Sequence, residues 1–194
     1  METTTRLTRK ERIYQEAARL FRDKGYRATS MRDLADSVGL EPSSLYSHIS
    51  SKQELLHKIC FDCGQRFLSG MEEVLQTAES PTEALEQLIR LHVTIASEDV
   101  TAITVFNDEW RHLEQPELDD FLRMRRGYEE QFELVVTEGM QTGQFRQLEP
   151  KMALNTLLSA VQWVYRKKQI NGDEVERIAA GIAEMLLNGL NTKS

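Results

Sequence analysis

The sequence predicts an all-α protein in which three short helices precede a bundle of six longer ones, about nine helices in total. Three observations support this fold class. Apolar residues recur every three or four positions along most of the 194 residues, which is the spacing of a helix with one buried face. The four prolines and half of the ten glycines fall between these periodic segments or at their ends. The alternation of apolar and polar residues that marks a half-buried strand is absent from the sequence.

The first 50 residues contain the signals of the short helices. An apolar face runs from Ile13 to Phe21, and this helix should end at Gly25, because glycine readily adopts the left-handed conformation that closes a helix. Thr29 or Ser30 can cap a second helix, and Ser30 followed by Asp33 resembles a capping box. A short second helix therefore begins directly after it.

The second and third helices have the spacing of a helix-turn-helix motif. Such a motif needs a small residue on its first helix and a glycine in the turn, and Ala35 and Gly39 fit these positions. Pro42 suits the first turn of the third helix, where its missing N–H would have no partner in any case. Leu45 and Ile49 are one turn apart and should pack inward. The other side of the third helix is then free to face the major groove of DNA.

The motif predicts a DNA-contacting surface around the third helix. Its serines can each bond to a base edge, but a serine makes none of the two-point contacts that discriminate strongly between bases. Tyr46, His48 and Lys52 are expected to hold phosphates. The predicted DNA-contacting residues are Thr29, Ser30, Ser43, Ser44, Tyr46, Ser47, His48 and Lys52. The alternative is a small helical hairpin whose serines are merely exposed to solvent.

Six longer helices are expected after residue 50. Prolines or short polar segments separate them, as in "ESPTEAL" and "QTGQF". Their expected ranges are about 51–78, 81–96, 101–113, 117–140, 150–168 and 173–187. The chain is therefore divided into a helix-turn-helix domain over residues 1–50 and a helical bundle over residues 51–194.

Charge is divided unevenly between these two parts. The formal net charge is -7, the wrong sign for meeting a polyanion such as DNA. Residues 1–58, however, hold 11 Lys and Arg against 8 Asp and Glu, a net charge of +3, whereas the remainder carries -10. This asymmetry indicates one part that faces nucleic acid and another that faces something else.

Two absences bear on location. No apolar run approaches the roughly 20 residues of a membrane-spanning helix, and "METTTRLTRKER" lacks the apolar core of a secretion signal. A cytoplasmic protein without a membrane partner is therefore expected. Cys60 and Cys63 are more consistent with small buried side chains than with a disulfide, a metal site or an oxidation sensor.

The N-terminal region resembles the DNA-binding domain of TetR-family transcriptional regulators over the stretch "AARLFRDKGYRATSMRDLADSVGLEPSSLYSHISSKQELL". The matching features are an FxxxGY segment, a capped Thr-Ser pair, an Ala-xxx-Gly turn, LYxHI, and a lysine that opens the fourth helix. One departure is Ile49, where the family usually has an aromatic residue. The resemblance implies a homodimeric repressor on a palindromic operator, whose C-terminal helices dimerise and bind a small-molecule effector that releases the DNA.

Aromatic and basic residues coincide at several places in the otherwise acidic bundle. A pocket that is apolar inside and basic at its mouth would suit a long acyl or aromatic group that carries phosphates. The predicted effector-binding residues are Phe106, Trp110, Arg111, Arg125, Tyr128 and Trp163. The stretches "NDEWRHL" and "RRGYEEQFELVVTEGMQTGQF" also resemble TetR-family members that sense acyl-CoA thioesters, which implies a CoA thioester as effector. The alternatives are an unrelated aromatic or drug-like effector, or tryptophans and arginines with purely structural roles.

The last two expected helices are rich in small and apolar residues. Small residues allow helices to approach closely, so that two helices from each of two chains can form a four-helix interface. The predicted dimer contacts are Leu154, Leu158, Val161, Ile182 and Leu186. The alternative is that this apolar surface is buried within one chain.

An enzyme is not expected. Glu54-x-x-His57 and Glu109-x-x-His112 have the spacing of di-iron ligands, but such pairs arise readily by chance among 31 acidic residues. The first pair also lies at the joint between the two domains. No phosphate-binding glycine loop or nucleophile elbow is present in the sequence. We therefore expect no catalytic residue, metal or cofactor, with a helical adaptor that does not bind DNA as the runner-up.

Overall fold

The computed structural model describes residues 7–167 and 170–188, and all regular secondary structure in these residues is helical. The all-α prediction is therefore confirmed. No helix within the described ranges has both the length and the apolar character that crossing a membrane requires.

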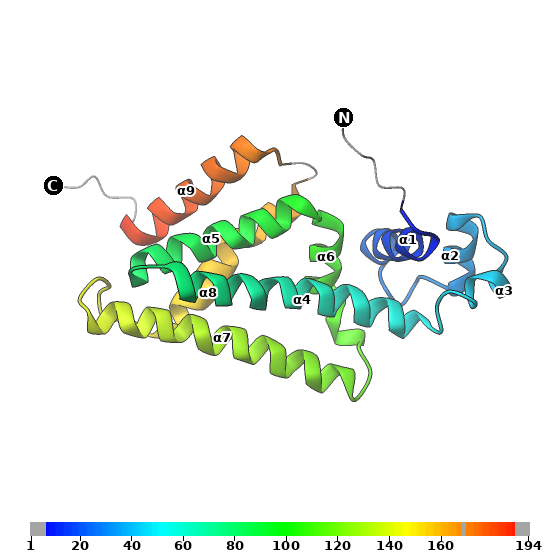
Figure 1. Ribbon diagram of the computed structural model, residues 1–194, viewed down its shortest axis with the longest axis horizontal. Helices are drawn as coiled ribbons and strands as arrows, with labels where there is room; N and C mark the ends of the chain where they lie inside the picture. The colour runs from blue at the N-terminus through cyan, green and yellow to red at the C-terminus, as the bar shows by residue number, and fades with distance from the viewer. Residues whose placement is uncertain (1–6, 168–169, 189–194) are drawn as a thin grey trace.

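Three short helices form one end of the molecule (Figure 1). They are α1 (Arg9–Lys24), α2 (Met31–Val38) and α3 (Pro42–Leu45). In Figure 1, α2 and α3 lie beyond α1 at the extremity of the molecule, so that the predicted DNA-contacting region is its outermost part.

The bundle makes up the rest of the molecule. Its helices are α4 (Lys52–Thr77), α5 (Pro81–Glu98), α6 (Val100–Asp108), α7 (Glu117–Gln141), α8 (Pro150–Gln162) and α9 (Gly172–Asn188). Helix α4 runs from the three short helices into the middle of the bundle, with α5 packed on one side of it and α7 on the other (Figure 1). Helix α9 packs mainly on α5, and α8 mainly on α7.

The ends of the short helices follow from local side-chain chemistry. Helix α2 begins with the predicted capping box: Ser30 Oγ accepts from the N–H of Asp33 at 3.1 Å, and Asp33 Oδ2 accepts from the N–H of Ser30 at 2.9 Å. The bonds from Ser30 hold the pKa of Asp33 well below its usual range. Gly25 ends α1 with a φ of 86°, and Gly39 ends α2 with a φ of 67°, where glycine is favoured because it has no Cβ.

The third helix is shorter than expected. Its regular part ends at Leu45, and hydrogen-bonded turns continue the chain through His48. Ser47 Oγ donates to the Ser44 carbonyl at 2.7 Å, and local bonds of this kind compete with a regular helix. Leu45 and Ile49 nevertheless pack inward, as predicted. The departure from the family pattern at Ile49 is thus accommodated in the core.

Two of the expected bundle helices are interrupted. The segment expected as one helix over residues 101–113 leaves the α-helix at Asp108 and continues as a 3-10 turn, η1 (Trp110–His112). Helix α8 likewise ends at Gln162 and is followed by a second 3-10 turn, η2 (Val164–Arg166). The other four helices begin and end within two residues of the predicted bounds.

The three short helices share an apolar core with the start of the bundle. One core cluster joins α1, α2 and α3 to the first turns of α4, where Leu55 and Leu56 are fully buried. The same cluster includes Val105 of α6 and Phe121 of α7, whereas a second cluster fills the remainder of the bundle. Of the three short helices, α1 therefore packs directly on α4 and α6, and Phe121 of α7 completes the same core.

Candidate functional site

A cavity of about 460 Å³ lies between α4, α5, α6, α7 and α8. Five of the residues predicted to bind an effector line it together: Phe106, Trp110, Arg111, Arg125 and Tyr128. Trp163 does not, and for this residue the prediction is corrected. It follows the last turn of α8, where its side chain points outward, is 45% exposed and lies under the ammonium of Lys167. The effector-binding role of the other five stays a prediction.

The rim of the cavity is aromatic and basic. The exposed Arg111 lies over the Trp110 ring, 4.7 Å from its centroid, and the exposed Arg125 lies 5.7 Å from the same centroid. Trp110 in turn stacks on Phe121, with centroids 5.7 Å apart. Arg125 Nε donates to Glu129 at 2.9 Å, whereas Arg111 forms no ion pair with any described residue. Arg111 is therefore available to an anionic group.

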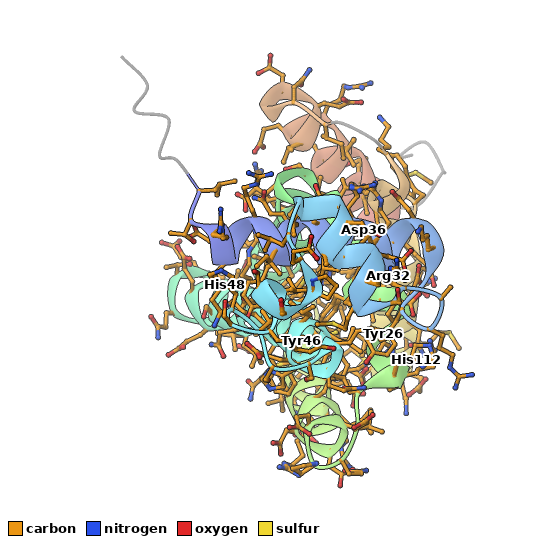
Figure 2. The ribbon with its side chains drawn as sticks, turned by 90° about the vertical axis from the view of Figure 1, so that its right-hand side faces the viewer. Tyr26, Arg32, Asp36, Tyr46, His48 and His112 are labelled. Atoms are coloured by element: carbon orange, nitrogen blue, oxygen red, sulfur yellow. The ribbon has the colours of Figure 1, made fainter. Side chains whose placement is uncertain are left out.

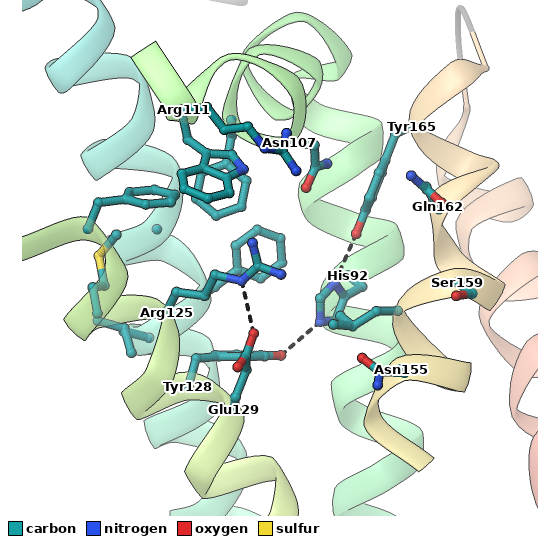
Figure 3. Close-up of a pocket in the computed structure, with 18 residues that line it drawn as sticks. His92, Asn107, Arg111, Arg125, Tyr128, Glu129, Asn155, Ser159, Gln162 and Tyr165 are labelled. Atoms are coloured by element: carbon teal, nitrogen blue, oxygen red, sulfur yellow. Dashed lines mark hydrogen bonds and ion pairs between the residues drawn. The ribbon is translucent and has the colours of Figure 1, made fainter. Parts of the chain in front are cut away.

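Buried polar side chains form the inner wall of the cavity (Figure 3). His92 of α5 is 3% exposed, with Nδ1 3.0 Å from the hydroxyl of Tyr165 and Nε2 2.8 Å from the hydroxyl of Tyr128. Burial lowers the pKa of His92 to about 4, so that its ring is neutral at neutral pH. Burial also raises the pKa of both tyrosines, which therefore keep their hydroxyl protons.

Asn107, near the end of α6, also lines the cavity. Its Nδ2 is buried and has no hydrogen-bond partner among the described residues. Leaving a buried donor unpaired costs about 1–3 kcal/mol. Neither Asn107 nor His92 was predicted from the sequence, although His92 carried a usable signal: it is a polar residue at a position where the apolar pattern of α5 requires burial.

The predicted DNA-contacting surface surrounds α3. Ser43, Ser44, Tyr46 and Ser47 are exposed, and His48 is half-buried. Figure 2 looks onto this end of the molecule and shows Tyr46 and His48 on it. Their contacts with DNA stay predictions.

Thr29 does not take the role expected of it. Its side chain is 2% exposed, and its hydroxyl donates to the carbonyls of Leu20 and Gly25, at 3.2 and 2.9 Å. The prediction that Thr29 contacts DNA is therefore corrected, because its hydroxyl stabilises the end of α1. Ser30, beside it, remains exposed while its side chain caps α2.

Lys52, also expected to hold a phosphate, has a structural role in this structure. Its ammonium donates to the carbonyls of Tyr26 and Thr29, at 2.9 and 2.8 Å, and lies 4.2 Å from the centroid of the Tyr26 ring. Partial burial lowers its pKa. The charge ties the start of α4 to the turn after α1 through two of its three N–H donors, so that in this structure it is directed at carbonyl oxygens. A lysine at this point of the sequence fits either role, and only the direction of its side chain distinguishes them.

The segment formed by α6 and η1 connects the cavity to the three short helices. His112 stacks on Tyr26, with ring centroids 5.5 Å apart and planes 18° from parallel, and both are labelled in Figure 2. Gln53 Nε2 donates to the His112 carbonyl at 2.7 Å. Arg22 Nη1 donates to Thr101 Oγ1 at 2.7 Å. A displacement of η1 therefore changes contacts made by the turn after α1 and by α4.

Two family models match the chain. "Bacterial regulatory proteins, tetR family" covers residues 13–59, and "Tetracyclin repressor-like, C-terminal domain" covers residues 78–190, which is more than half of the chain. The chain is a TetR-family transcriptional regulator. The resemblance seen in the sequence is thereby confirmed, and the helical adaptor is set aside.

Known proteins are similar to most of this TetR-family regulator. The HTH-type transcriptional repressor KstR2 of Mycolicibacterium smegmatis is 29% identical over 140 residues, which make up 72% of this chain and 68% of the relative. The structure of AibR in complex with isovaleryl coenzyme A and operator DNA gives a TM-score of 0.80 at 25% identity, covering 93% of this chain and 98% of that chain. KstR2 of Mycobacterium tuberculosis shares the fold, with a TM-score of 0.88 at 20% identity over 97% of this chain and 98% of the other.

Most of the dimer contacts predicted for this TetR-family regulator lie inside the chain. Leu154, Val161 and Ile182 are 2%, 0% and 8% exposed and belong to the bundle core, while Leu158 lines the cavity. The predictions for Leu154, Val161 and Ile182 are corrected, because α8 and α9 turn these residues toward their own neighbouring helices. Leu158 and Leu186 are half-buried and stay predictions. Other apolar side chains are exposed on or directly after these helices: Met152, Trp163 and Met185.

In this regulator, hydrogen bonds hold Glu54 in place, and both cysteines are buried. Glu54 accepts bonds from the N–H and hydroxyl of Ser50, both at 2.7 Å, and these bonds lower its pKa to about 2. Cys60 and Cys63 are buried free thiols, and burial raises the pKa of Cys63 to about 12. Within the described ranges, no three His, Cys, Asp or Glu residues are grouped so as to hold a metal ion.

Proposed function

We propose that this regulator is a dimeric repressor that binds a palindromic operator and is released when a CoA thioester, such as an acyl-CoA, occupies the cavity. The proposal rests on one observation: the α6–η1 segment both lines the cavity and contacts the turn after α1. It contributes Trp110 and Arg111 to the cavity and His112 to the contact with Tyr26. A ligand in the cavity therefore presses on the same turn that contacts the DNA-binding helices.

The chemistry of the cavity suits a CoA thioester. Phe106, Trp110 and Phe121 offer apolar surface to an acyl group, and the volume lies in the usual range for small-molecule sites. The unpaired guanidinium of Arg111 can bind a phosphate through two parallel hydrogen bonds. The likeness to AibR, whose structure contains isovaleryl coenzyme A and operator DNA, supports the same ligand class. An aromatic or drug-like effector, the second candidate, would use the aromatic wall without needing Arg111.

Release requires two conformations that the effector distinguishes. It must bind the conformation that has left DNA more tightly than the one that binds DNA. In our proposal, the acyl group displaces Trp110, and η1 then moves His112 against Tyr26. Because Lys52 ties α4 to the turn that contains Tyr26, α4 tilts with the DNA-binding helices. The separation of the two α3 helices in a dimer then no longer matches major grooves about 34 Å apart.

The proposed dimer uses the outer faces of α8 and α9. Met152, Trp163 and Met185 are exposed there, and exposed apolar side chains on neighbouring helices favour a partner surface. A second copy of the chain is the proposed occupant, since two helices from each chain form a symmetric four-helix interface. Sedimentation at micromolar concentration should give about twice the monomer mass of 22.4 kDa, and Trp163→Glu should shift it toward the monomer. Wild-type protein that sediments only as a monomer would refute the dimer.

The deciding experiment combines operator binding with effector titration. Genomic fragments retained in a gel shift identify the operator, and fluorescence anisotropy measures its release by decanoyl-CoA and isovaleryl-CoA, with free CoA and decanoic acid as controls. Arg111→Gln should raise the thioester concentration needed by roughly 10-fold, because a charge-assisted bond to phosphate is lost. Arg126→Gln is the matched control, since Arg126 is exposed on α7 and does not line the cavity. Failure to bind any genomic fragment overturns the repressor, and release by other compounds but by no thioester overturns the effector class.

A further inference from the structure

The inner wall of the cavity holds one more hydrogen-bonding proton than its own contacts use. His92, Tyr128 and Tyr165 together carry three such protons when the ring is neutral, one N–H and two O–H. Only two contacts join them, one at each ring nitrogen. At one nitrogen the ring donates to a tyrosine oxygen, and at the other a tyrosine donates to the ring. The tyrosine that accepts therefore keeps a hydroxyl proton without a partner among the described residues.

A second unpaired donor comes from α6. Nδ2 of Asn107 is buried without an acceptor, although Asn107 lines the same cavity as the two tyrosines (Figure 3). A half-turn of the amide exchanges its two ends, so that the NH₂ group can be presented to a ligand. The carboxylate that lines the cavity, Glu129, is already paired with Arg125. With the amide turned in this way, the buried end of the cavity offers donors in excess of acceptors.

We propose that the buried end of the cavity is a subsite for a neutral carbonyl oxygen carried on the hydrophobic part of the effector. Asn107 Nδ2 and the free hydroxyl of Tyr128 or Tyr165 donate to this oxygen, which accepts through two lone pairs. The inference rests on the proposed function only in taking this cavity as the effector site.

A carboxylate fits the buried end less well than a ketone. The arginines that line the cavity, Arg111 and Arg125, are exposed at the rim, and His92 is neutral. A carboxylate placed among the inner side chains would lose its hydration without gaining a counter-charge. The site therefore separates two tasks: an anionic part of the effector is held at the rim, and a neutral oxygen is held inside.

The subsite narrows the effector class to oxygenated acyl groups. A saturated hydrocarbon chain would leave both donors buried and unpaired, whereas an oxo-acyl chain or a keto ring would satisfy them. Sites built to bond an oxygen reject the analogue that lacks it more strongly than apolar pockets reject a change of one methylene. The preference for an oxo group should therefore be measurable in one matched pair of ligands.

Two matched probe pairs test the subsite. One pair is decanoyl-CoA and 9-oxodecanoyl-CoA, and the other, which contains no CoA, is phenylcyclohexane and 4-phenylcyclohexanone. Titration calorimetry on the full chain should show the oxo member of each pair binding roughly 10-fold more tightly. Asn107→Leu should reduce this preference to less than about 3-fold while leaving the hydrocarbon member unchanged or tighter. Asn107→Asp, which replaces the donor by an acceptor, should reverse it.

The control and the outcomes keep the subsite separate from the CoA proposal. Gln76→Leu removes an exposed amide near the end of α4, away from the cavity lining, and should keep the full preference. Thioesters that bind without an oxo preference overturn the subsite and leave the CoA proposal standing. A ketone preference without thioester binding overturns the CoA proposal and leaves the subsite standing. Binding of neither pair overturns both, and a preference that survives in Asn107→Leu overturns the role of Asn107. Tighter binding of 4-phenylcyclohexanecarboxylate than of the ketone would refute a neutral subsite.

Discussion

Replacing Lys52 with methionine should lower the free energy of unfolding by about 2 kcal/mol. The ammonium donates to the carbonyls of Tyr26 and Thr29 and lies over the Tyr26 ring. A hydrogen bond to a charged group contributes about 1.5–3 kcal/mol, and a cation–π contact at an exposed site about 0.5–1 kcal/mol. Because Lys52 is only partly buried, water can reach the carbonyls in the variant, which reduces the net loss to about 2 kcal/mol. Methionine keeps the aliphatic stem, so the loss reports on the ammonium.

Two measurements separate this structural role from a phosphate contact. Urea unfolding followed by circular dichroism should show a midpoint lower by roughly 1 M, for an m-value of about 2 kcal/mol/M. The slope of log affinity for the operator against log salt concentration should stay unchanged in Lys52→Met. Loss of one phosphate contact would instead reduce the magnitude of that slope by about 0.9.

Lys58→Met is the matched control on the same helix. Lys58 pairs with Asp62 at 2.6 Å across an exposed turn of α4, and such pairs contribute less than about 1 kcal/mol. The urea midpoint of Lys58→Met should therefore be close to that of the wild type. If Lys52→Met keeps the wild-type midpoint but has a flatter salt slope, the lysine acts on phosphate and our reasoning is wrong.

Three further changes test other parts of the molecule. The pKa of His92 is about 4 in the folded state and 6.5 in the unfolded state. As pH falls, the imidazole is therefore protonated first in the unfolded chain, and roughly 3 kcal/mol of stability should be lost between pH 6.5 and pH 4. His92→Gln should remove this part of the pH profile of urea unfolding, and an unchanged profile would exclude His92 as its source. Gly39→Ala should lower the free energy of unfolding by about 1–2 kcal/mol, because a φ of 67° is unfavourable for alanine even though no atom lies within 4 Å of the new Cβ. The control, Gly127→Ala within α7, should be neutral or stabilising, since alanine favours a helix. Equal effects of the two substitutions would contradict the backbone argument. His112→Ala should leave the separate affinities for operator and effector nearly unchanged while raising the effector concentration needed for release in the anisotropy assay, and wild-type release would disprove coupling through Tyr26.

The helical framework followed from the sequence because its signals act over one turn. Ser30 and Asp33 cap α2 across three residues, and Gly39 supplies the left-handed conformation that the turn requires. Prediction failed at Asp108 and Gln162, where apolar spacing continues but the α-helix stops. At the first of these breaks the 3-10 turn places a histidine against a tyrosine 86 positions earlier in the chain, a contact that no local pattern encodes.

The candidate site followed from the sequence only in part. Composition was enough to select Trp110 and Arg111, whereas the inner wall depends on His92 meeting partners 36 and 73 positions later in the chain. Leu154 and Val161 have the same apolar chemistry whether their own chain or a partner buries them, and only helix packing decided between the two. Sequence alone therefore determined the helices, the family and the residue types of the pocket. Tertiary structure decided which groups meet, because hydrophobic burial has no preferred direction and a polar side chain bonds whichever partner the packed helices bring within reach.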